Sequence, residues 1–103
     1  MNNKTTFFRK TLLTLVMSVA CLLAYAQKTV TGQVKDQSGE PLIGVSIQVK
    51  GSTTGTITDF DGNFTMPDVE ASDVLVFSYV GFTSQEVTVG NQSTINVTLS
   101  EDT

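Results

Sequence analysis

GEPLIGVSIQVKGSTTGTITDFDGNF, residues 39–64, contains the densest run of turn and strand signals in the chain. Apolar and polar residues alternate over residues 45–50, which predicts a half-buried strand. Threonines occupy every second position over residues 54–58, and a polar turn, DFDGN, follows them. The stretch therefore predicts two strands separated by glycine-rich turns, with a third strand beginning at the turn's end.

The third of these strands covers residues 63–66 and is ended by Pro67. Four further segments complete the predicted pattern: residues 30–35, 74–80, 82–89 with a bend or bulge near residues 84–86, and 94–99. Residues 74–80 are apolar on both alternations, which predicts a central strand covered on both sides. In the last segment Ile95, Val97 and Leu99 are expected to face inward. The sequence predicts an all-β, Greek-key sandwich of about seven strands, and a closed barrel is the alternative.

The first residues have the three parts of a helical secretory signal peptide. Three basic residues precede an apolar run, residues 11–23, and Ala24 and Ala26 form an A-x-A cleavage signature. The apolar run is shorter than the roughly 20 residues that a membrane-spanning helix needs. We therefore expect residues 1–26 to be a signal peptide, residues 27–103 to be one exported domain, and the mature chain not to span the membrane.

Cys21 raises the alternative of a lipoprotein, in which a cysteine becomes the lipidated first residue. The usual leucine three places before the cysteine is missing, and the apolar run continues beyond Cys21 where a polar tether is expected. We interpret Cys21 as part of the signal peptide and expect it to be removed with it.

Removal of the signal peptide leaves Lys28, Lys35 and Lys50 as the basic residues, against ten acidic ones. Nucleic acids and anionic lipids require clustered lysine or arginine, so this balance argues against both as partners. The chain has no histidine, and its one cysteine lies in the signal peptide. The usual serine or cysteine nucleophile–histidine pairs and nitrogen–sulfur zinc sites are therefore excluded.

Carboxylates are the remaining candidates for chemistry. Asp59 with Asp61, and Asp68 with Glu70, could serve as acid and base pairs, but a domain this small offers no cleft to perturb them. We expect no enzyme activity, no catalytic residues and no cofactor. Asp59, Asp61 and Asn63 also form part of a calcium-loop pattern, but the later acidic ligand is missing, so a hairpin turn is the favoured interpretation.

A domain without chemistry must act through a surface, either a sheet edge or an apolar patch. Tyr79 and Phe82 are the candidates for such a patch. Aromatic residues in alternating strands usually fill the interior, so a core position is the favoured interpretation for both.

Two segments carry a family resemblance: VTGQVKDQSGEPLIGVSIQVKGSTTGTITDFDGNFTM, residues 30–66, and VLVFSYVGFTSQEVTV, residues 74–89. Together they resemble the carboxypeptidase-regulatory-like domain at the N-terminus of SusC/RagA-type TonB-dependent receptors of Bacteroidetes. The matching positions are glycines, turn acids and strand residues: Gly32, Val34, Asp36, Gly39, Pro41, Leu42, Gly44, Val45, Gly51, Gly55, Thr58, Asp59, Asp61, Gly62, Phe64, Ser78, Tyr79, Gly81 and Phe82.

The resemblance implies a transthyretin-like (prealbumin-like) sandwich in the periplasm, ahead of a plug and a barrel in the outer membrane. The whole receptor would import glycans or peptides with a SusD-like lipoprotein partner and energy from TonB. The zinc-holding catalytic domain of metallocarboxypeptidases is not among these residues. We expect either the N-terminal piece of such a receptor or, as the alternative, a free-standing exported binding or adhesion module, for example for carbohydrate.

Overall fold

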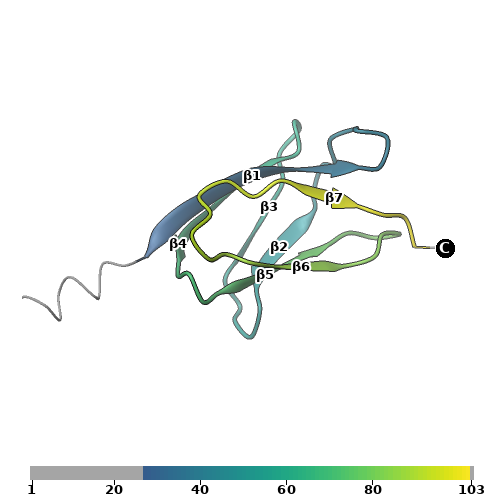
Figure 1. Ribbon diagram of the computed structural model, residues 1–103. Coiled ribbons are helices and arrows are strands. Elements are labelled where there is room, and N and C mark those ends of the chain that lie inside the picture. The colour runs from purple at the N-terminus through teal and green to yellow at the C-terminus, as the bar shows by residue number, and fades with distance from the viewer. Residues whose placement is uncertain (1–26, 103) are drawn as a thin grey trace, which may run out of the picture.

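The computed structural model describes residues 27–102, so the predicted signal peptide, its cleavage site and Cys21 lie outside the described residues. Seven strands form two sheets (Figure 1). The three-stranded sheet has the order β4 (Asn63–Val69), β1 (Lys28–Asp36), β7 (Val97–Leu99). The four-stranded sheet has the order β3 (Gly55–Ile57), β2 (Ser46–Val49), β5 (Val74–Ser78), β6 (Gln85–Thr88). The predicted all-β sandwich class is confirmed.

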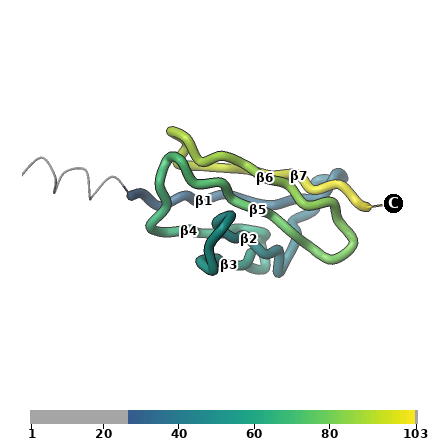
Figure 2. Tube along the Cα trace, turned by 90° about the horizontal axis from the view of Figure 1, so that it is seen from below, coloured from purple at the N-terminus to yellow at the C-terminus, as the bar shows by residue number. Residues whose placement is uncertain are grey.

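The inner faces of the two sheets meet in one apolar core. Phe64 of β4 and Phe77 of β5 cross this interface edge to face, with ring centroids 5.5 Å apart. The buried apolar residues come from every strand except β3 and β6, and three of them, Val45, Val89 and Ile95, lie just outside the strands. The full set is Val30, Val34, Val45, Ile47, Phe64, Met66, Val69, Leu75, Phe77, Val89, Ile95, Val97 and Leu99. The start of β1 and the last described residues lie at opposite ends of the sandwich (Figures 1 and 2).

β1 is the central strand of its sheet, antiparallel to β4 and parallel to β7. A Cβ atom on Gly32 would lie 1.7 Å from the backbone oxygen of Ile95, so only glycine fits this point. The Asn96 side chain accepts a hydrogen bond from the Gln33 N–H and replaces a backbone partner there. Because this side-chain bond interrupts the backbone pairing, the strand predicted at residues 94–99 is shortened to Val97–Leu99. Ile95, Val97 and Leu99 face inward as predicted.

Pro67 lies inside β4, so the prediction that it ends the strand after Met66 is wrong. β4 is an edge strand, and its register with β1 shifts between Lys28 and Val30. Asp68 takes a positive φ of 59° within this irregular stretch. A proline that cannot donate to a ladder is tolerated at a bulged sheet edge, which explains why the strand continues to Val69.

β5 occupies the predicted central position, between β2 and β6, but the expectation that both its faces are covered is wrong. Leu75 and Phe77 are buried, whereas Val76 is only half-buried on the outer face. The register places Gln48 and Glu86 on either side of Val76, and these long side chains shield it partly from water. The run of apolar residues therefore predicted the central position of β5 in its sheet correctly, but it wrongly predicted a covering layer on the outer face.

The predicted bend or bulge near residues 84–86 is also wrong. β5 and β6 pair without interruption from Val74 opposite Thr88 to Phe77 opposite Gln85. Phe82 lies in the connecting loop and forms an isolated bridge with Glu101. The change of alternation that suggested a bulge arises because Phe82 is outside the strand.

Two connections cross between the sheets at the same place: residues 37–45 from β1 to β2, and residues 58–62 from β3 to β4. Thr58 is buried between them. Its hydroxyl Oγ1 accepts a hydrogen bond from the Val45 N–H (2.9 Å) and donates one to the Leu42 oxygen (2.6 Å). The Thr58 oxygen also accepts from the Gly44 N–H at 3.1 Å. One side chain thus satisfies backbone groups of the neighbouring connection.

Asp36 closes the turn that begins the first of these connections. Its Oδ1 accepts hydrogen bonds from the Ser38 hydroxyl (2.6 Å), the Ser38 N–H (2.9 Å) and the Glu40 N–H (3.0 Å). The Ser38 hydroxyl, followed by the Glu40 N–H, lowers the pKa of Asp36 below its ordinary value of 3.8. The ionised carboxylate is therefore the form that the turn requires.

We expect Thr58→Val to lower the free energy of unfolding by about 2 kcal/mol, because valine keeps the shape but leaves two buried backbone groups without their partner. Denaturant unfolding of the mature domain measures this loss. Thr65→Val, at an exposed position of β4, serves as the control and is expected to change stability by less than about 0.5 kcal/mol. Equal costs for the two variants would contradict the assigned role of the Thr58 hydroxyl.

The lowered pKa of Asp36 predicts a pH dependence. A depressed folded-state pKa stabilises the fold above the ordinary value of 3.8, and this contribution is lost as the pH falls through the lowered pKa. NMR titration of the Asp36 carboxyl is expected to give a midpoint below 3.8. Ser38→Ala should raise that midpoint, whereas Ser72→Ala, in a distant exposed loop, should leave it unchanged. A midpoint at or above the ordinary value in the unmodified protein would refute this account.

Candidate functional site

The calcium candidates Asp59, Asp61 and Asn63 lie together in the turn between β3 and β4. Asp59 Oδ1 accepts hydrogen bonds from the backbone N–H groups of Asp61 and Asn63, each at 2.9 Å. The Asp59 backbone oxygen accepts from the Gly62 N–H at 3.0 Å, and Gly62 takes a φ of +76°. These contacts are those of a tight turn with glycine at the positive φ, so Asp59 has a structural role that needs no cation.

Residues 27–102 contain no group of three or more His, Cys, Asp or Glu side chains arranged to hold a metal ion. Calcium binding by Asp59, Asp61 and Asn63 stays an untested hypothesis. The second acidic pair, Asp68 and Glu70, lines one open hollow together with Asp73. Asp68 lies in the irregular end of β4, and the Glu70 N–H donates to Asp73 Oδ2. The Asp68 and Glu70 side chains are both exposed, with no enclosed cleft around them.

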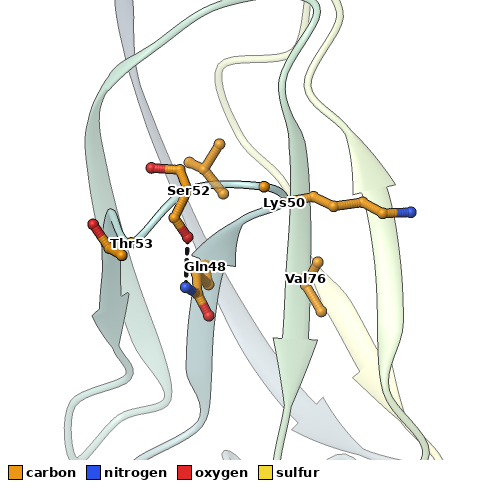
Figure 3. Close-up of a pocket in the computed structure, with 7 residues that line it drawn as sticks. Gln48, Lys50, Ser52, Thr53 and Val76 are labelled. Atoms are coloured by element: carbon orange, nitrogen blue, oxygen red, sulfur yellow. Dashed lines mark hydrogen bonds between the residues drawn. The ribbon is translucent and has the colours of Figure 1, made fainter.

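An open hollow of about 420 Å³ lies on the outer face of the four-stranded sheet (Figure 3). Gln48 and Val76 form its floor, and Ser52 and Thr53 border it from the β2–β3 loop. The Gln48 amide Nε2 already donates to the Ser52 oxygen at 2.6 Å. Lys50 extends toward β6, where its Nζ lies 2.7 Å from Glu86 Oε1. The Gln48 amide and the Lys50 ammonium therefore already have partners, and the hollow is open to solvent.

Tyr79 and Phe82, the aromatic candidates for a surface patch, lie in the β5–β6 loop with ring centroids 5.5 Å apart. Both are half-buried and pack against the core, in agreement with the core interpretation. The exposed apolar residue of this loop is Val80, which lies between them. Sequence reasoning assigned Val80 to the central strand, and its position directly before Gly81 was the signal that could have placed it in a loop.

The matched family model is the CarboxypepD_reg-like domain, over residues 30–103. TonB-dependent receptor SusC of Bacteroides thetaiotaomicron is 47% identical over 102 residues. TonB-dependent receptor P26 of Formosa agariphila is 46% identical over 82 residues. These alignments cover 97% and 80% of this chain, but 10% and 8% of the respective receptors. The chain therefore spans about a tenth of the length of these curated relatives.

Among solved structures, two type II cohesin–X-dockerin complexes from Acetivibrio cellulolyticus contain similar chains. An interface mutant altered at the C-terminus matches with a TM-score of 0.53 and 21% identity, over 69% of this chain and 52% of the other. An N-terminal interface mutant matches with a TM-score of 0.51 and 22% identity, over 71% of this chain and 51% of the other. At this identity the likeness shows the fold alone.

Residues 27–102 contain no helix long and apolar enough to cross a membrane. The family model covers nearly the whole of the domain that the structure describes, and the alignment to SusC takes in 97% of the chain. The chain belongs to the CarboxypepD_reg-like domain family, in the form found in TonB-dependent receptors.

Proposed function

We propose that this chain is the N-terminal, periplasmic domain of a TonB-dependent outer-membrane receptor and acts through protein contacts. The observation that carries the proposal is the match to SusC, which takes in 97% of this chain and 10% of the receptor. Because nearly all of this chain aligns to a small part of a much longer receptor, the match supports the proposal that the chain is one module of a larger protein.

The geometry supports a non-enzymatic role. The carboxylates of Asp36 and Asp59 accept backbone hydrogen bonds within turns, and the Lys50 ammonium is paired with Glu86. The described hollows are open to solvent, whereas sites that run acid–base chemistry enclose the groups whose properties they shift. What remains available is surface: the edge strands β3, β4, β6 and β7, the loops, and the outer face of the four-stranded sheet.

Export is part of the proposal. The signal peptide, residues 1–26, would be cleaved after Ala26, which removes Cys21 and leaves Gln27 as the first mature residue. The domain would then lie on the periplasmic side of the outer membrane. Its partners would be the plug and barrel of the same polypeptide, a SusD-like lipoprotein and TonB, and the imported substrate would be a glycan or a peptide.

The DNA downstream of the codon for Thr103 tests the proposal first. We expect an open reading frame that encodes a plug and a barrel. A stop codon directly after Thr103 would contradict the proposal and favour a free-standing exported module.

Deletion of the domain within the full receptor tests the role in transport. We expect removal of residues 27–102 to reduce substrate uptake by intact cells while the barrel still reaches the outer membrane, because the deletion removes contacts and leaves the transmembrane part intact. Uptake is measured with labelled substrate, and receptor quantity by immunoblotting of membranes. Unchanged uptake at equal receptor quantity would contradict a role in transport.

Hydrolysis of a substrate by the domain that disappears in Asp59→Asn or Asp61→Asn would contradict the non-enzymatic role.

A further inference from the structure

The two ends of the sandwich differ in the chemistry of their loops. Residues 50–54, 70–73 and 90–94 lie at the end where the described chain begins: Lys50 N–H donates to the Val74 oxygen, Gly90 N–H to the Ala71 oxygen, and Lys28 Nζ to the Gly90 oxygen. Ala71 is the one apolar side chain in these three loops. This end is polar, as the loops of a soluble domain usually are.

The opposite end, where Asp102 lies, carries the exposed large apolar side chains of the described part of the chain. Val80 is 94% exposed, Phe60 87%, Ile57 66% and Ile43 49%. They come from three loops and the end of β3, so no single hydrophobic segment accounts for them. Scattered exposed apolar residues are ordinary, but confinement of all four to one end is what a contact surface produces.

Backbone contacts join the segments that carry these side chains. The Gly44 N–H, next to Ile43, donates to the Thr58 oxygen, next to Ile57. Ser46 pairs with Ile57 on one side and with Ser78 on the other. A hollow of about 400 Å³ is lined by residues of the first loop and of the β5–β6 loop, and it reaches Val80: Gly44, Ser46, Ser78, Tyr79 and Val80. We call Ile43, Ile57, Phe60 and Val80 the C-terminal apolar surface.

The last described residues lie at the end of the sandwich opposite the start of β1 (Figures 1 and 2) and contact the β5–β6 loop, which carries Val80. The Asp102 N–H donates to the Gly81 oxygen at 2.9 Å, one residue from Val80. The Thr83 N–H donates to the Ser100 oxygen at 2.9 Å, and Phe82 pairs with Glu101. These bonds fix the last described residues against the β5–β6 loop, so any following polypeptide starts within reach of the surface without a long linker.

The same end is acidic. Lys35 is its basic residue, whereas its carboxylates come from the loops and from the chain's exit: Asp36, Glu40, Asp59, Asp61, Glu101 and Asp102. An apolar surface with an acidic rim fits a partner surface of apolar residues rimmed by lysine or arginine, because complementary charges steer and orient contact.

We propose that the C-terminal apolar surface docks against the part of the receptor that follows Thr103, and that this part presents an apolar patch with basic side chains around it. The inference rests on the proposed function, since it requires a receptor. It adds that the domain is held against the receptor body through Phe60 and Val80, instead of hanging free on a linker.

Hydroxyl-radical footprinting of the full-length receptor tests the docking, with Phe60 as the reporter ring. We expect Phe60 to be oxidised slowly in the unmodified receptor, and at least about fivefold faster in Val80→Arg, because a charged side chain cannot be buried against a basic-rimmed apolar patch. Asn91→Arg, at the polar end, is the matched control and should leave the Phe60 rate unchanged. Phe77, buried in the core, should stay slow in all three proteins and reports that the domain is folded.

Phe60 that is oxidised rapidly in the unmodified receptor, as its 87% exposure in the domain predicts, would overturn the docking. A slow Phe60 rate that persists in Val80→Arg would show that the four side chains are not one contact surface. Protection that appears only when a second receptor or a lipoprotein is added would assign the surface to that partner and overturn contact within the chain. Each of these results is compatible with the proposed function, whereas a stop codon directly after Thr103 would contradict both the proposed function and the docking.

Discussion

The close approach of Gly62 to β1 is the constraint on which the rest of the structure depends. The Val34 N–H donates to the Gly62 oxygen at 2.8 Å, and a Cβ atom on Gly62 would lie 2.7 Å from the Val34 oxygen and 2.9 Å from Pro41 Cβ. Gly62 and Thr58 both belong to the connection from β3 to β4, and both contact the connection from β1 to β2. Two of the four connections that pass between the sheets are thereby fixed to each other.

The sequence was sufficient for the parts of the fold that depend on local alternation and turn chemistry. The inward faces of β1, β2 and β7 follow the period of two, and Asp36 and Asp59 close turns that their Asp–Gly neighbourhoods predict. The errors concern neighbours that a local pattern cannot contain. Pro67 continues a strand because it lies at a bulged edge, and Val76 stays half-exposed because the sheet's outer face carries only the flanking side chains of Gln48 and Glu86.

The candidate site shows the same division. The sequence marked residues 59–63 as the most chemical-looking segment, and the structure uses it as a turn whose glycine fits between β1 and the Pro41 loop. The sequence analysis did not identify the C-terminal apolar surface, because it assigned Val80 to the central strand and interpreted the segment around Phe60 only as a polar turn. The geometry shows that the glycine and acids of this turn serve the architecture, and the contact surface proposed above lies at the end where the chain leaves the domain.

Replacement of Gly62 by alanine tests the central claim most directly, because Gly51 provides a control with a similar positive φ. Both glycines take a positive φ, 76° and 80°, but nothing lies within 4 Å of a Cβ on Gly51. Gly51→Ala is expected to cost about 1 kcal/mol, the ordinary penalty of alanine at a positive φ. Gly62→Ala is expected to cost about 2 kcal/mol more in denaturant unfolding, because its methyl group also pushes the two connections apart. Equal losses for the two variants would contradict the claim that the packing of Gly62 against β1 holds the sandwich together.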